Sequence, residues 1–71
     1  MLEEDKVLIK KIVLKVKKLR KEANVSQRIM YYDTEINMGR LETGTHNINI
    51  TTIRRICEYF HISLEEFFKG L

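Results

Sequence analysis

Two side chains of this sequence stand at a spacing that could bind a metal ion. Cys57 and His61 are four residues apart, so on a helix they would lie on the same face. Structural metal sites use four ligands, however, and His46 is the only other histidine in the chain. We therefore expect no metal and no cofactor, and we interpret Cys57 as a small residue of the core.

The sequence also lacks the residue patterns of an active site. It has no Gly-rich phosphate loop, no serine or cysteine placed beside a histidine by a recognisable motif, and no carboxylate pair expected to face inward. A chain of 71 residues also has little room for a substrate pocket. We therefore expect a protein that is not an enzyme.

The middle of the chain contains two short helical patterns separated by polar residues. Ser26 is a natural N-cap for the first helix. Met38 and Leu41 are three residues apart, so they share one side of a second helix, expected over about 34–42 with Thr34 as its cap. Two short helices joined by a tight turn form a helix-turn-helix, whose second helix enters the major groove of DNA.

The elements that must hold this motif are predicted to be helices as well. The sequence has no proline and only three glycines, which favours an all-α fold. An apolar stripe with steps of three and four residues over 9–23 predicts a long first helix. Asn49 and Ser63 can cap a fourth and a fifth helix. We expect one compact domain over 1–71, with residues 1–5 frayed.

The charge of the chain is unevenly distributed. The net charge is +3, which suits an anionic partner. Residues 1–21 carry eight Lys or Arg and three acids, a balance of +5, whereas residues 22–71 carry five and seven, a balance of −2. The half with the helix-turn-helix is thus slightly acidic. The lysines of the first helix form either a solvated face or a contact with a nucleic-acid backbone.

The compartment is predicted from the cysteine content and from the absence of targeting segments. A single cysteine cannot form an internal disulfide, which indicates a reducing cytoplasm. Acidic residues stand near the N-terminus where a signal peptide would have basic ones. No apolar stretch approaches the roughly 20 residues needed to cross a bilayer. We expect a cytoplasmic protein with no membrane contact.

Several short motifs, in order and in register, closely resemble the Cro/lambda-repressor-like helix-turn-helix family, also called the xenobiotic-response-element (XRE) family. The resemblance runs from about Ile9 to Phe68. It is carried by Leu19-Arg20, Ser26-Gln27, Leu41-Glu42-x-Gly44, Asn47-Ile48-Asn49-Ile50-Thr51-Thr52-Ile53 and Ile62-Ser63-Leu64-Glu65-Glu66-Phe67-Phe68. It implies a compact five-helix lambda-repressor-like domain.

The sequence departs from the family pattern in one place. The family usually has about three more residues between the Ser-Gln and the Leu-Glu-x-Gly motifs. We assign the missing residues to the end of the second helix and the turn, around Tyr31 to Thr34. The usual turn glycine has no clear equivalent. We expect Tyr31 and Tyr32 to close the core over the short turn rather than to stack on bases.

The resemblance implies roles for residues at matching positions. The side chains that would face the groove and contact bases are Glu35, Ile36, Asn37 and Arg40. Those that would contact the sugar-phosphate backbone are Gln27, Thr45, His46 and Asn47. Arg20 and Glu42 match the two ends of a structural ion pair between the first and third helices.

The chemistry of the four groove-facing residues leaves alternatives open. Arg40 could bind O6 and N7 of a guanine bidentately, or remain a solvated surface residue. Asn37 could pair with an adenine or touch a phosphate. Ile36 could meet a thymine methyl group or fill the gap left by the short turn. Glu35 could accept from a cytosine amine, or stabilise the N-terminus of the third helix.

We interpret the whole as a sequence-specific DNA-binding transcriptional regulator and, more narrowly, a repressor. A homodimer on palindromic double-stranded DNA is expected, with its interface at Phe67, Phe68 and Leu71. One alternative is the antitoxin of a toxin–antitoxin pair, with the toxin as protein partner. Another is a protein-interaction module that kept the fold but lost DNA binding, for which the acidic balance of residues 22–71 speaks.

Overall fold

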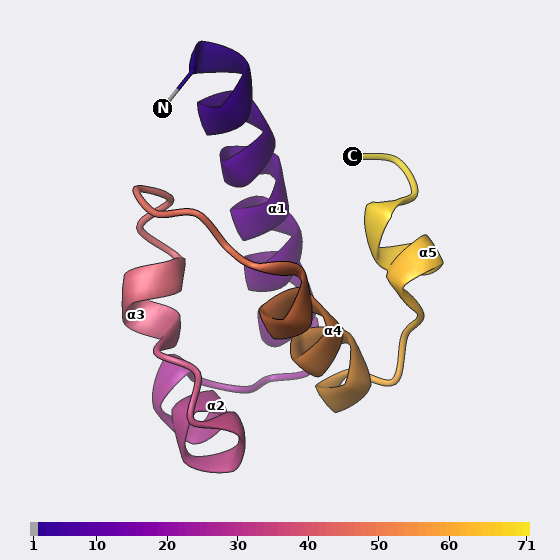
Figure 1. Ribbon diagram of the computed structural model, residues 1–71. Helices are drawn as coiled ribbons and strands as arrows, with labels where there is room; N and C mark the ends of the chain where they lie inside the picture. Colours follow the sequence, from indigo (N-terminus) through magenta and orange to yellow (C-terminus); the bar gives the residue numbers. More distant parts are fainter. Residues whose placement is uncertain (1) are drawn as a thin grey trace.

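All regular secondary structure in the computed structural model, which describes residues 2–71, is helical (Figure 1). α1 is the longest helix, and α3 and α5 lie on opposite sides of it (Figure 1). The five helices of this part of the chain are α1 (Glu3–Glu22), α2 (Gln27–Thr34), α3 (Met38–Leu41), α4 (Ile50–Tyr59) and α5 (Leu64–Phe68). The predicted all-α fold with five helices is therefore confirmed.

α1 begins earlier than the apolar pattern predicted. Its first turn consists of the acidic residues Glu3, Glu4 and Asp5, and its last turn contains basic residues. Both features stabilise a helix by complementing its dipole. The expectation that residues 1–5 fray is wrong from Glu3 onward, and Met1 lies outside the described residues.

Each helix contributes one large, fully buried side chain to a common core. These are Val16, Met30, Met38, Ile56 and Phe67, from α1 to α5 in order. The two methionines are unbranched and fill irregular gaps well, which suits the meeting point of short helices. Because every helix is anchored in this one core, the orientation of α3 is fixed from several sides.

Cys57 belongs to the same core, as the sequence predicted. Its side chain is buried, and burial raises the pKa of its thiol because the charged form loses its hydration. His61 follows α4 in a left-handed backbone conformation and is exposed. The two residues therefore do not share a helix face.

Side-chain caps begin four of the five helices of residues 2–71. Three caps were predicted and are confirmed: Ser26 Oγ accepts from Ile29 N at 3.1 Å, Asn49 Oδ1 from Thr52 N at 2.8 Å and Ser63 Oγ from Glu66 N at 3.0 Å. The prediction of Thr34 as a cap is wrong. Asn37 caps α3, with its Oδ1 accepting from Arg40 N at 3.0 Å.

The third helix is shorter than the sequence predicted. α2 has eight residues and extends to Thr34, whereas α3 has only four residues, a single turn, instead of the predicted span 34–42. The Thr34 hydroxyl donates to Met30 O at 2.7 Å and accepts from Ile36 N at 3.1 Å, so it closes α2. Glu35 then takes the left-handed conformation, with φ 62°, which a turn glycine would adopt.

The two tyrosines of α2 are exposed, which contradicts their predicted role in the core. Tyr32 is 81% exposed and Tyr31 is 54% exposed. Ile36, at 8%, fills the space beside the turn instead, and Met30 supplies the buried side of α2. The turn is therefore closed by an aliphatic residue after α2 rather than by the aromatic pair.

α4 holds the end of α2 through two polar contacts. Tyr59 Oη donates to Asp33 Oδ2 at 2.6 Å, and Arg55 donates to the carbonyl oxygen of Thr34. The hydrogen bond to Asp33 raises the pKa of the Tyr59 hydroxyl.

None of the helices within residues 2–71 combines the length and the apolar composition that a bilayer crossing needs.

Candidate nucleic-acid interface

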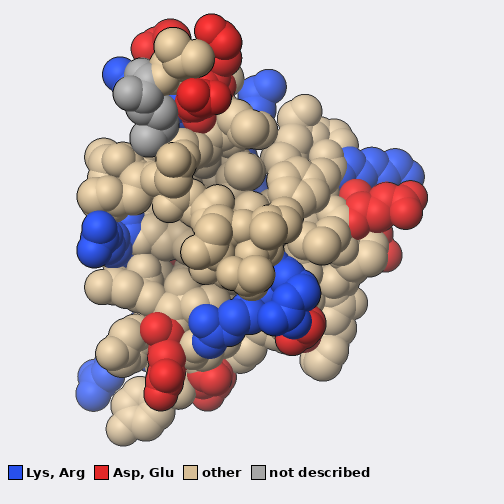
Figure 2. Space-filling view, viewed as in Figure 1, with Lys and Arg blue, Asp and Glu red and all other residues tan. Residues whose placement is uncertain are grey.

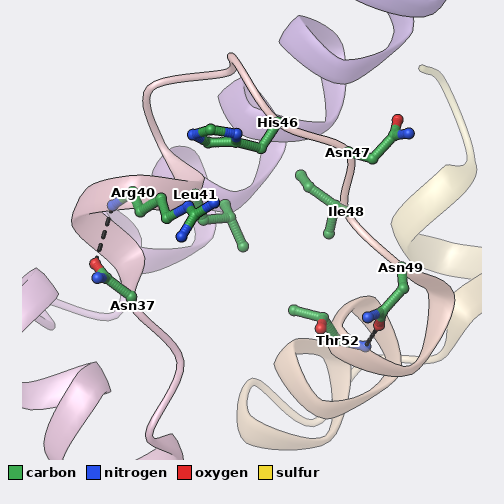
Figure 3. Close-up of a pocket in the computed structure, with 8 residues that line it drawn as sticks. All are labelled: Asn37, Arg40, Leu41, His46, Asn47, Ile48, Asn49 and Thr52. Carbon is green, nitrogen blue, oxygen red and sulfur yellow. Dashed lines mark hydrogen bonds between the residues drawn. The ribbon is translucent and has the colours of Figure 1, made fainter.

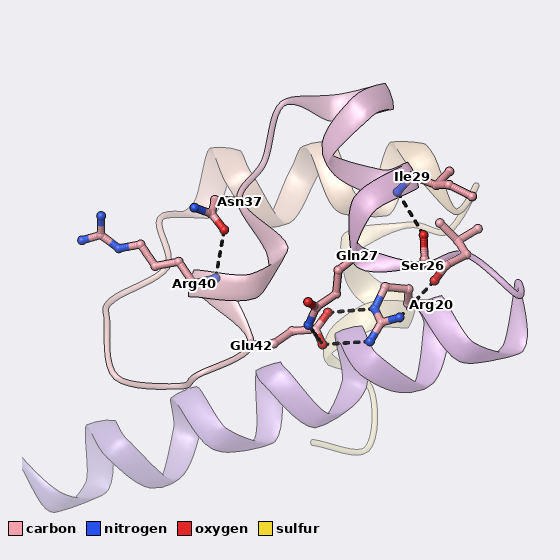
Figure 4. A network of polar contacts seen from close by, with 8 residues as sticks. Arg20, Ser26, Gln27, Ile29, Asn37, Arg40 and Glu42 are labelled. Carbon is pink, nitrogen blue, oxygen red and sulfur yellow. Dashed lines mark hydrogen bonds and ion pairs between the residues drawn. The ribbon is translucent and has the colours of Figure 1, made fainter.

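A buried polar network joins α1, α2 and the end of α3 (Figure 4). Arg20 binds Glu42 with two hydrogen bonds, from Nε to Oε2 at 2.9 Å and from Nη2 to Oε1 at 3.0 Å. Arg20 Nη1 also donates to Val25 O at 3.1 Å, and Gln27 Nε2 donates to Glu42 Oε1 at 3.0 Å. The predicted Arg20–Glu42 ion pair is thus bidentate, a geometry that fixes both partners.

The electrostatics of the network favour the charged pair. Burial raises the pKa of the Glu42 carboxyl, but the hydrogen bonds from Arg20 and Gln27 outweigh it, and the pKa is lower than the ordinary value. The hydrogen bond to Glu42 raises the pKa of the Arg20 guanidinium. Both groups therefore remain charged near neutral pH and hold α3 against α1.

The exposed side of α3 is formed by Asn37, Gly39 and Arg40. Figure 4 shows the Arg40 side chain extending away from the helix, and within residues 2–71 its guanidinium has no hydrogen bond or ion pair. Asn37 Oδ1 is occupied by the cap to Arg40 N. Asn37 can therefore donate from Nδ2, but bidentate pairing with an adenine would compete with the cap.

Gly39 leaves bare backbone between two of the predicted contact residues. A Cβ at this position would lie 3.5 Å from Asn37 Oδ1 and 3.7 Å from Gln27 Oε1, which is ordinary contact distance. The fold itself therefore has room for a side chain here. Because Gly39 has no side chain, a large partner could approach the backbone of α3 closely at this position.

Two of the predicted base contacts do not lie on the exposed side of α3. Ile36 is buried beside the turn, as expected under the alternative that it fills the gap, and it offers little surface for a thymine contact. Glu35 is exposed, but it terminates α2 and precedes the cap residue Asn37. It therefore lies on neither face of α3 and does not belong to the N-terminal turn that it was expected to stabilise.

Gln27 has a structural partner that the sequence did not reveal. It is exposed and opens α2 next to the cap residue Ser26, yet its Nε2 is bonded to Glu42. It therefore helps to position α3 from the start of α2. A phosphate contact by its remaining N–H or by the first amides of α2 stays a prediction.

The loop after α3 returns to the same surface. Thr43 Oγ1 donates to Arg40 O at 2.6 Å and lies 2.9 Å from Thr45 Oγ1, which orders the first part of the loop. The loop then borders a shallow hollow between α3 and the start of α4 (Figure 3). Its lining residues are Asn37, Arg40, Leu41, His46, Asn47, Ile48, Asn49 and Thr52.

The hollow brings together four predicted contact residues and two that were missed. Asn49 and Thr52 were not predicted at the site, although the capping pattern that places Asn49 there was visible in the sequence. The hollow has a volume of about 140 Å³, well below the roughly 300–1,000 Å³ of small-molecule sites. It therefore suits contact with an extended partner better than enclosure of a ligand.

Charge on this side of the molecule is dispersed. In the view of Figure 2, the blue Lys and Arg side chains form separate groups, with acidic side chains between them and a broad uncharged surface in the centre. Acidic residues gather at the start of α1, at the top of the view. The face of the molecule in this view therefore does not present one basic patch.

The model of the Cro/C1-type HTH DNA-binding domain family matches residues 5–69 of the chain. The protein belongs to this family. No curated protein and no solved structure showed a significant match. Membership confirms the resemblance and supports a DNA-binding, transcription-regulatory role for this Cro/C1-type domain, and domains of this family are typically non-enzymatic.

The residues predicted for a dimer interface in this Cro/C1-type domain are not all exposed. Phe67 is fully buried in the core, and its ring packs edge-to-face on Phe68 with a centroid distance of 5.2 Å. It cannot contact a second copy without unfolding α5. Phe68 is 37% exposed, and Leu71 is half-buried against the core.

Proposed function

We propose that this Cro/C1-type domain is a sequence-specific transcriptional repressor that reads the major groove with α3. The observation that carries the proposal is the unpaired Arg40 guanidinium on a helix fixed from behind by the Arg20–Glu42 pair. A fixed backbone matters because bidentate recognition of guanine O6 and N7 depends on geometry. A small domain bound at an operator can repress by excluding polymerase, without a further activating surface.

The size of α3 supports binding as a homodimer. A helix of four residues is about 6 Å long, so one copy reaches few base pairs. Two copies on a palindrome, with half-sites about one helical turn apart, double the sequence that is read. With Phe67 in the core, support for the interface comes from Phe68 and from Leu14, an exposed α1 residue that lines one hollow with Leu71.

The proposal is tested by selecting random duplex DNA against the purified protein and against two variants. We expect wild type to enrich a palindrome and Arg40→Ala to lose preference at one base pair in each half-site, worth about 1–3 kcal/mol of discrimination. The control is Arg54→Ala, which removes an exposed arginine that pairs with Glu58 on α4. It leaves every base preference unchanged. Absence of enrichment, or an unchanged preference in Arg40→Ala, would refute the proposal.

A second candidate, a protein-interaction module, is favoured by the outer surface of α2. Ile29, Tyr31 and Tyr32 are exposed there, which is more apolar surface than an isolated short helix usually leaves to water. Such a module, including an antitoxin bound to its toxin, would bury this surface against a protein. Binding to DNA weakens linearly in log affinity with log salt, whereas a contact between apolar protein surfaces does not, so a salt titration separates the two.

A further inference from the structure

Six of the seven lysines of α1 form two separate stripes, and the seventh, Lys21, stands in its last turn. At 3.6 residues per turn, Lys6, Lys10 and Lys17 fall within about 40° of one another around the helix axis. Lys11, Lys15 and Lys18 form a second stripe, centred about 120° away. The sets are defined here as the motif-side stripe (Lys6, Lys10 and Lys17) and the far-side stripe (Lys11, Lys15 and Lys18).

The motif-side stripe lies beside the loop that follows α3. Lys6 and Lys10 line one hollow together with Thr43, Gly44 and Thr45. The contact is close, because a Cβ on Gly44 would be 3.9 Å from Lys10 Cγ. The Lys10 stem thus lies beside the loop.

Lys17 continues the stripe toward the end of α3. Its charge lowers the pKa of Glu42, after the larger effects of burial and of the hydrogen bonds, which places Lys17 near the Arg20–Glu42 pair. The exposed Glu3 carboxylate, 3.9 Å from Lys6 Nζ, would compete only weakly with a phosphate for the Lys6 ammonium group. The far-side stripe instead lines a hollow with Leu14 and Leu71.

Figure 4 places these elements relative to the proposed DNA-binding side. α1 runs below α3, and its N-terminal half lies on the same side as the loop after α3 and the extended Arg40 side chain. A DNA strand that follows the loop therefore passes within reach of the first half of α1. The charge distribution also favours α1 as the part that contacts phosphates. α1 contains most of the positive charge, whereas residues 22–71 have a net charge of −2.

We infer that Lys6, Lys10 and Lys17 bind the phosphate backbone of the DNA next to the loop after α3. In this arrangement α1 supplies the sequence-independent affinity that a one-turn recognition helix and an acidic motif region lack. The inference rests on the proposed function, because it requires DNA to lie against α3 and the loop.

The test compares two variants that lose the same charge from two different faces of α1. One is K6Q/K10Q/K17Q, and the other is K11Q/K15Q/K18Q. Binding of each to the selected duplex is measured by fluorescence anisotropy at several salt concentrations. We expect the motif-side variant to reduce the slope of log affinity against log salt by about 2.7, which is 0.9 for each of three lost phosphate contacts. The far-side variant keeps nearly the wild-type slope.

The loss in the motif-side variant is expected to be equal on the selected operator and on a scrambled duplex, because phosphate contacts carry no sequence information. Circular dichroism melting checks that the variants are folded, and K6Q/K10Q keeps the test valid if the change at Lys17 unfolds the domain. Equal slopes for the two triple variants would overturn this inference alone. A wild-type protein without salt-dependent DNA binding would overturn the proposed function as well.

Discussion

Removal of the Arg20 side chain is expected to destabilise the domain more than any surface change, because it leaves the buried Glu42 carboxylate without its ion-pair partner. The Glu42 side chain is 2% exposed and has Arg20 as its ion-pair partner. Removing one partner of a buried pair costs about 3–5 kcal/mol. A chain of this length has a total stability of roughly 4–11 kcal/mol. Arg20→Met is therefore expected to leave the domain marginally stable at pH 7.

The assay is urea unfolding followed by far-UV circular dichroism for wild type, Arg20→Met, Glu42→Met and the double variant. Because the double variant contains no stranded charge, we expect it to be more stable than Arg20→Met alone, which gives a coupling energy for the pair. The control is Arg54→Met, which breaks an exposed pair with Glu58 and costs about 0–1 kcal/mol.

The pH dependence of the free energy of unfolding gives an independent test of this prediction. In wild type the pKa of Glu42 is below its ordinary value of 4.5, so its contribution is present above that pH and is lost as the pH falls through the folded-state pKa. In Arg20→Met, burial acts without the ion pair, so the pKa of Glu42 rises and protonation relieves the penalty. The difference in unfolding free energy between the two proteins narrows as the pH falls through the raised pKa of Glu42 in Arg20→Met. A gap under about 1 kcal/mol at pH 7, or one independent of pH, would refute the reasoning.

Four further predictions concern the ends of the helices and α3. Gly39→Ala is expected to raise the free energy of unfolding by about 0.5–1 kcal/mol in urea titrations, because the fold has room for the Cβ. It is expected to weaken DNA binding in anisotropy measurements, because the proposed function places DNA against this surface. Glu35→Gly relieves a left-handed φ of 62° and is expected to stabilise by about 0.5–1 kcal/mol and to tighten DNA binding at low salt. His61→Gly relieves a φ of 58° after α4 and should give a similar rise in melting temperature without the effect on DNA; equal DNA effects would contradict the placement of Glu35. Asn49→Ala removes the cap of α4 and should lower stability by about 1 kcal/mol, and no change in urea would contradict the capping role.

Much of the fold was predictable because its signals are local. Cap residues stand directly before the helices that they begin, and three of them were identified from residue type alone. The apolar stripe of α1 predicted which of its side chains are buried. The Arg20–Glu42 pair is 22 residues apart in sequence, so no local signal reveals it, and only the family resemblance suggested it.

The residue at which the third helix begins could not be predicted from local signals. Thr34 and Asn37 are both good cap residues, so a third helix could begin at either position. The usual glycine signal for the turn is absent, because Glu35 adopts the left-handed conformation itself. The choice is made by Ile36, which is buried when the turn ends at Asn37, and burial against residues distant in sequence cannot be read from a short window.

The length of α3 limits how specific the proposed recognition of DNA can be. With a one-turn α3, Arg40 is the main candidate for base recognition, and one bidentate contact discriminates by about 1–3 kcal/mol. On the proposed palindrome, two half-sites would give about 2–6 kcal/mol, a factor of roughly 30 to 20,000, which reaches only the lower part of the range of about 10³–10⁷ found for DNA-binding proteins. We therefore expect modest sequence discrimination. The phosphate contacts proposed for the lysines of α1 would add affinity but no discrimination, because they do not read bases.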